Sequence, residues 1–173
     1  DIAASFAGIV WLIIAWFVEK KPKFIGLLTG AVAGLATITP AAGFVTPTSA
    51  AIIGIIAGVV CYFAVSLKNK LQLDDALDVW GVHGVGGFIG IILLGVFANA
   101  SVNGAGRNGL LLGNTSFFLK EVAAVLGTSV YAFGVSFGML WLINKITPVK
   151  VSQSDEENGL DEALHGESAY EMI

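Results

Sequence analysis

Long uncharged stretches, separated by short charged clusters, are the main pattern along this sequence. Residues 2–18 carry no charge, and residues 24–67 carry none over 44 positions. As a single helix the second stretch would measure about 66 Å at 1.5 Å per residue, roughly twice the hydrocarbon core of a bilayer. It must therefore fold back, and the prolines and glycine within residues 39–49 mark the break.

This pattern predicts an all-α polytopic membrane helix bundle with five spans, at about residues 2–18, 24–43, 49–67, 78–98 and 121–144. We expect residues 1–150 to form the transmembrane region. Residues 151–173 then form a C-terminal tail outside the bilayer.

Composition agrees with this interpretation, because 55% of the residues are hydrophobic and only 13% are charged. A soluble domain carries roughly 25% charged residues, so a soluble enzyme and a nucleic-acid-binding protein are both excluded. The single cysteine, Cys61, excludes a disulfide framework and a multi-thiolate metal site. Because the sequence opens on Asp1 at the mouth of an apolar run, without Met, we expect a fragment of a longer polypeptide.

Basic residues predict the orientation of the spans, because cytoplasmic loops are enriched in Lys and Arg. In a five-span arrangement seven lysines fall on one side, and Arg107 and Lys120 on the other. The C-terminus is therefore expected in the cytoplasm. The seven lysines are Lys20, Lys21, Lys23, Lys68, Lys70, Lys145 and Lys150.

Glycines recur four residues apart within the spans, which places small residues on one helix face and predicts close helix packing. The series are Gly26, Gly30 and Gly34; Gly54 and Gly58; Gly86 and Gly90; and Gly134 and Gly138.

His83 lies about five residues inside the fourth span, where an ionisable side chain is costly and indicates function. A neutral imidazole offers one donor and one acceptor, which suits a small polar molecule or a proton relay. The alternative is a buried histidine that only hydrogen-bonds a neighbouring helix. Asp78 is expected to have a structural role at the start of this span, where a carboxylate complements the helix dipole.

The tail is acidic, with seven Asp or Glu residues and no Lys or Arg within residues 151–173. Composition alone favours a solvated tail, whereas Gly159 and Gly166 favour a folded, docked segment. Ser154 and Glu157 have the spacing of a capping box.

Four stretches together resemble the ammonium transporter (Amt/MEP/Rh) family, of the Amt type, over essentially the whole chain. Residues 78–87 (DVWGVHGVGG) resemble its second pore-histidine motif, and residues 30–43 resemble a span that ends in TPAAG. Residues 106–114 resemble its extracellular loop, and residues 159–170 its cytoplasmic tail signature.

The resemblance implies an eleven-span inverted-repeat fold, of which this chain is similar to spans seven to eleven. It implies ammonium transport through a hydrophobic, histidine-lined pore, in a homotrimer in the plasma or inner membrane, with a PII signal-transduction protein as a partner. His83, Val79 and Thr39 would then line the pore. The tail signature would supply the regulatory residues Gly159, Leu160, Asp161, His165, Gly166 and Tyr170.

Three alternatives stay open at this point. A sensor or receptor for ammonium and a Rhesus-type ammonia channel share the fold. An intramembrane enzyme would need a second catalytic group near His83, and the sequence offers none. We expect no cofactor, no metal site and no nucleic-acid partner.

Overall fold

Helices dominate the computed structural model, which describes residues 1–168 and contains no strand within them. Five of these helices are long and apolar enough to cross a membrane, which confirms the expected all-α, five-span class. They are α1 (Ile2–Glu19), α2 (Phe24–Ile38) with the short turn η1 (Thr39–Ala41), α3 (Pro47–Lys70), η2 (Trp80–Gly84) continued by α4 (Val85–Phe97), and α5 (Thr115–Asn144).

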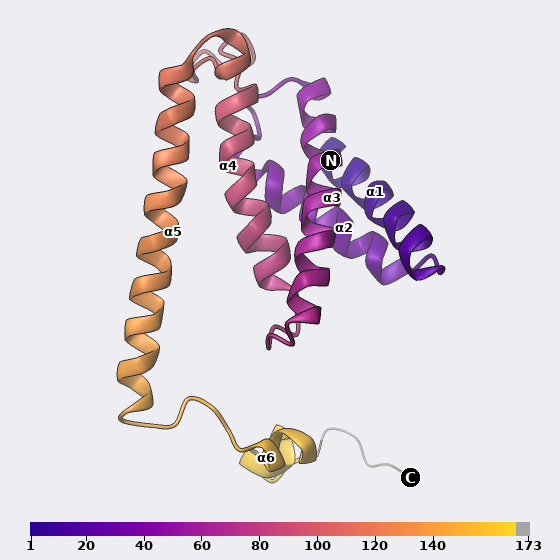
Figure 1. Ribbon diagram of the computed structural model, residues 1–173, viewed down its shortest axis with the longest axis vertical. Coiled ribbons are helices and arrows are strands. Elements are labelled where there is room, and N and C mark those ends of the chain that lie inside the picture. The colour runs from indigo at the N-terminus through magenta and orange to yellow at the C-terminus, as the bar shows by residue number, and fades with distance from the viewer. Residues whose placement is uncertain (169–173) are drawn as a thin grey trace. The chain divides into compact units, whose positions relative to one another are not determined.

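The chain divides into two compact units, one from Asp1 to Gly127 and one that begins at Thr128. Within the first unit, α2 and α3 each contact both α1 and α4 (Figure 1). The boundary between the two units lies inside α5. It differs from the expected boundary at residue 150, since the units are defined by compact packing and the expected boundary by the polarity of the sequence. The division into a membrane region and a tail at residue 150 stays a prediction.

Small residues let α1 lie directly against α2 and α3. A Cβ added at Gly34 of α2 or at Gly54 of α3 would lie 2.5 Å from the backbone oxygen of Ala3. One turn along α1, a Cβ at Gly30 or Gly58 would lie 3.0 or 2.8 Å from the backbone oxygen of Ala7. The expected role of these glycines in close packing is therefore confirmed.

The glycines of α5 differ from those of α2 and α3. Among the described residues, a Cβ added at Gly134 or Gly138 meets no heavy atom within 4 Å apart from the nearby backbone of its own helix. Both glycines belong to the second unit, and the packing role expected from their spacing stays a prediction.

Side-chain caps set the starts of α3 and α5. Thr46 accepts a hydrogen bond from the Ser49 amide at 3.2 Å, and Pro47 occupies the first helical position. Asn114 accepts from the Phe117 amide at 3.0 Å, so α5 begins six residues before the expected position 121. Lys120 and Glu121 make this part of the sequence polar, but charges are tolerated in the exposed first turns of a 30-residue helix.

Candidate functional site

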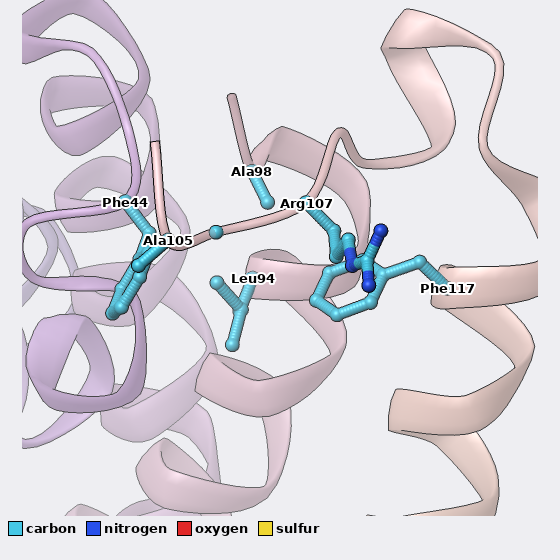
Figure 2. Close-up of a pocket in the computed structure, with 7 residues that line it drawn as sticks. Phe44, Leu94, Ala98, Ala105, Arg107 and Phe117 are labelled. Carbon is cyan, nitrogen blue, oxygen red and sulfur yellow. The ribbon is translucent and has the colours of Figure 1, made fainter. Parts of the chain in front are cut away.

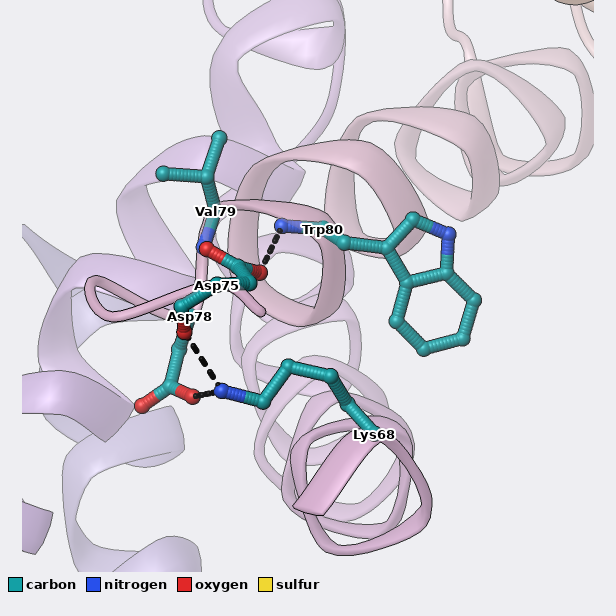
Figure 3. A network of polar contacts seen from close by, with 5 residues as sticks. All are labelled: Lys68, Asp75, Asp78, Val79 and Trp80. Carbon is teal, nitrogen blue, oxygen red and sulfur yellow. Dashed lines mark hydrogen bonds and ion pairs between the residues drawn. The ribbon is translucent and has the colours of Figure 1, made fainter. Parts of the chain in front are cut away.

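A polar network fixes the turn between α3 and η2 (Figure 3). Lys68, near the end of α3, donates to the Asp78 carboxylate and to the Asp75 backbone oxygen, each at 2.6 Å. The Asp75 carboxylate accepts from the backbone amides of Val79 at 2.9 Å and Trp80 at 2.8 Å. One carboxylate therefore caps the start of the fourth span, and the other holds the turn onto α3.

The structure gives Asp78 a structural contact at the start of the span that differs from a helix cap. Asp78 does stand at the start of the span, but its carboxylate pairs with Lys68, and Asp75 supplies the capping oxygens. The Trp80 amide, and after it the Val79 amide and the Lys68 cation, hold the pKa of Asp75 below its ordinary value. Asp78 also adopts a φ of +55°, a left-handed conformation that Asp and Asn tolerate better than most residues.

The fourth span begins with a widened helical turn, η2. The Val85 amide donates to the Trp80 carbonyl five residues back, whereas the Val82 amide donates to the Asp78 carbonyl four residues back. Such π-type turns are rare and occur frequently at functional sites.

Glycines bring the widened turn against its neighbours. A Cβ added at Gly81 would lie 2.6 Å from Cγ2 of Val65 on α3. A Cβ added at Gly86 would lie 2.9 Å from Oγ1 of Thr37 on α2 and 3.3 Å from Sγ of Cys61 on α3. Gly81 and Gly86 are five residues apart and both face the neighbouring helices, which the extra residue of the π turn allows.

His83 lies on the other side of this turn, exposed along a groove of about 230 Å³. The groove lies between α2 and the start of the fourth span, and all but two of its lining side chains are apolar. The lining residues are Ile25, Leu28, Thr29, Val32, Leu77, Val82 and His83.

Thr29 is the second polar residue of this groove. Its hydroxyl donates to the Ile25 carbonyl at 2.9 Å, so the oxygen keeps its acceptor capacity for a guest. Thr39, the first residue of η1 and seven residues beyond Val32, donates to the Leu35 carbonyl at 2.6 Å. Thr29 is therefore the hydroxyl of this segment that lies on the groove.

The structure separates the expected pore residues. His83 lines the groove, whereas Val79 and Thr39 are not among its described lining residues. Sequence analysis missed Ile25, Leu28 and Val32, although their spacing along α2 is a recognisable helical stripe. Nothing in one sequence shows which apolar stripe faces a histidine on another helix.

A second cavity lies beneath the loop that connects α4 to α5 (Figure 2). It measures about 230 Å³ and lies next to Arg107. The residues that line it are Phe44, Leu94, Ala98, Ala105, Gly106, Arg107 and Phe117. These residues belong to the loops and helix ends at the opposite end of the fourth span from Asp78.

The tail residues lie in and around two short helices, α6 (Gln153–Asn158) and η4 (Asp161–His165). Ser152, and not Ser154, caps α6 by accepting from the Asp155 amide at 3.2 Å. Gly159 (φ +95°) and Gly166 (φ +66°) bracket η4. Leu160, Asp161 and His165 are exposed, and Tyr170 lies outside the described residues.

Comparisons with known proteins identify the family. The model of the ammonium transporter family matches residues 1–170. The chain belongs to the ammonium transporter family.

One curated relative and two solved structures illustrate this relationship. An ammonium transporter of Bacillus subtilis (strain 168) is 46% identical over 98% of this chain and 42% of its own length. The crystal structure of Candida albicans Mep2 is 34% identical, with a TM-score of 0.82 over 89% of this chain and 35% of that one. A solved sensor Amt protein is 29% identical, with a TM-score of 0.82 over 94% of this chain and 40% of that one.

The chain thus spans about two fifths of the length of the curated relatives that it matches. It is a multi-pass member of a family of membrane transporters. The activity, substrate and partners of the whole protein are therefore given below as proposals.

Proposed function

We propose that this chain forms part of a transporter that moves ammonium across a membrane. The species that crosses is ammonia, either alone or together with the proton that ammonium gives up. The observation that carries the proposal is the imidazole of His83 on an apolar groove between spanning helices, in a chain of the ammonium transporter family. Val79 and Thr39 are proposed to line the same path at other heights.

The chemistry of the groove supports this substrate. Its apolar wall offers alkali cations nothing in place of their hydration shell, which disfavours their entry. Ammonia needs only a few hydrogen bonds, and the His83 ring and the Thr29 hydroxyl oxygen provide them. A groove with two polar groups therefore favours a small neutral molecule over a hydrated ion.

The proposal includes an assembly and a location. We infer a homotrimer in the plasma or inner membrane, with the C-terminus in the cytoplasm, where a PII signal-transduction protein docks. The lysines next to three spans support this orientation. The tail residues Gly159, Leu160, Asp161, His165, Gly166 and Tyr170 are proposed to transmit the regulation.

The test is uptake of radiolabelled methylammonium by the full-length protein. Replacing His83 by Ala should lower uptake at least tenfold or admit potassium, because the path loses its donor and acceptor. His83→Gln keeps hydrogen-bonding groups and should retain more activity. Wild-type uptake and selectivity in a well-assembled His83→Ala protein would refute the proposal.

A sensor is the second candidate, and the similarity to the solved sensor Amt protein favours it. Purified protein in liposomes distinguishes the two. A transporter acidifies or alkalinises the lumen in response to an ammonium gradient, whereas a sensor binds ammonium without such flux.

A further inference from the structure

Lys68 is a buried cation outside the groove, and its burial needs an explanation. Its side chain is only 7% exposed, and its ammonium group contacts the Asp78 carboxylate and the Asp75 carbonyl. A buried ion pair contributes little net stability compared with well-packed apolar residues, so stability alone does not explain it. Such pairs are better attested as devices that select one arrangement of the chain.

One face of α3 holds the start of the fourth span at three successive heights. Lys68 binds Asp78, Val65 packs against Gly81, and Cys61 packs near Gly86. The three α3 residues are spaced three and four apart and therefore share a helix face. The contacts at Gly81 and Gly86 are non-directional packing, whereas the contact at Asp78 is a directed ion pair.

The π turn lies between these heights, and His83 is part of it. A turn with one extra residue competes with a regular α-helix, which would rotate His83 relative to the contacts with α3. Asp75 caps the first amides of this turn, and Lys68 binds the backbone oxygen of the same residue (Figure 3). Lys68 therefore links α3 to both the cap and the left-handed residue from which the turn starts.

Other charged groups of this region do not share the role. Lys70 and Asp74 are exposed, and no hydrogen bond or ion pair connects either side chain to the described turn. The Lys68 ammonium contacts the Asp78 carboxylate and the Asp75 carbonyl, and its charge also acts on the Asp75 carboxylate.

We propose that Lys68, through its ion pair with Asp78, is a positioning residue that holds the His83 turn in its widened form and keeps the imidazole on the groove. The proposal rests on the transport function proposed for His83. Lys68 itself touches no substrate, because it lies on the α3 side of the turn and is absent from the groove lining.

Three variants of the full-length protein test this role. Lys68→Met removes the cation and keeps the length of the side chain. Lys68→Met combined with Asp78→Asn removes both charges, so that no buried charge is left unpaired and folding is retained. Asn at position 78 also tolerates the left-handed backbone. Lys70→Met, two residues away and exposed, is the matched control.

The readouts are methylammonium uptake and the nitrogen resonances of the His83 ring, identified by their loss in His83→Gln. We expect the double variant to assemble normally, with maximal uptake about tenfold lower, KM changed less than threefold, and shifted His83 resonances. Lys70→Met should match the wild type. A double variant with wild-type uptake and unchanged resonances would overturn the proposal.

The two proposals fail in different ways. If His83→Ala transports normally, the proposed role of His83 in transport is wrong. The nitrogen resonances of the His83 ring then decide by themselves whether Lys68 positions the ring. If His83→Ala is inactive while the double variant matches the wild type in both readouts, only the role of Lys68 is wrong.

Discussion

At the scale of single residues, Asp75 shows how one side chain defines where a span begins. Its two carboxylate oxygens accept from two successive amides, Val79 and Trp80. Asn has one side-chain oxygen where Asp has two, so only the carboxylate gives each amide an oxygen of its own. The Asp75 backbone oxygen also accepts a hydrogen bond from Lys68, and this contact couples the cap to the ion pair between Lys68 and Asp78.

The start of the fourth span should therefore depend on pH. Folding lowers the pKa of Asp75 from its ordinary value of 3.8, so the ionised cap stabilises the turn above that pH. This stabilisation is lost as the pH falls through the lowered pKa of the folded state. Hydrogen exchange should show protection of the Val79 and Trp80 amides falling in this acid range.

Two variants control this measurement. Asp75→Asn should show weaker protection of the two amides already at neutral pH and no acid transition. Asp74→Asn, at the exposed neighbouring position, should behave like the wild type. Equal acid transitions in wild type and Asp75→Asn would assign the titration to another group.

At the scale of elements, the spans were predictable because their signal is local. Charge-free stretches and proline breaks define four of the five helices to within a few residues. The start of α5 was misplaced because its first turns are polar, and the cap at Asn114 carries no hydrophobic signal. The widened turn at Trp80–Gly84 was not predictable, because it depends on packing of Gly81 against α3.

The candidate site divides in the same way. His83 stood out because an ionisable residue inside an apolar span is visible in the sequence. The groove partners Leu28, Thr29 and Val32 did not, because only the three-dimensional packing of α2 against the fourth span selects that face. The pairing of Lys68 with Asp78 was hidden for the same reason.

The tail elements allow a matched comparison of two glycines. Gly159 has φ +95° and ψ 130°, a region that is essentially confined to glycine, whereas Gly166 has φ +66° and ψ 24°, which Asn tolerates. We expect Gly159→Asn to cost about 1–3 kcal/mol locally and Gly166→Asn to cost much less.

Hydrogen exchange at Ala163 reports this difference, because its amide donates to the Gly159 carbonyl at 3.1 Å. Protection should fall about fivefold to 140-fold in Gly159→Asn, since 1.4 kcal/mol corresponds to a factor of ten. If η4 matters for regulation as proposed, uptake by the full-length protein should fall in the same variant and not in Gly166→Asn. Unchanged uptake in both variants would favour a solvated tail.

At the scale of the whole molecule, apolar side chains remain exposed on α1, α2 and α5, among them Phe17, Ile25 and Phe133, each more than 70% exposed. In a membrane protein such faces are covered by lipid or by other helices. The exposed His83 groove is one of these faces, and the transport proposal requires that it be completed by other helices.

The proposed orientation gives a prediction at this scale. A cysteine at Gly104 should react with a membrane-impermeant thiol reagent in intact cells, and a cysteine at Asn69 should not. Both positions are exposed, and a Cβ at Gly104 meets no atom within 4 Å among the described residues. The background is the full-length protein without other cysteines, including the buried Cys61. Labelling at Asn69 and not at Gly104 would reverse the orientation.

The widened turn at Trp80–Gly84 also has an evolutionary consequence. This turn holds one residue more than an α-helix of the same height, so chain length matters there in a way that it does not in a loop. Deleting one residue would let the turn close as regular α-helix, so that the helix beyond it keeps its faces while the residues within the turn, His83 among them, change direction by up to about 100°. Substitutions in this segment alter a side chain, but an insertion or deletion changes which way the histidine faces, and homologues that keep the groove should therefore carry no gap across it.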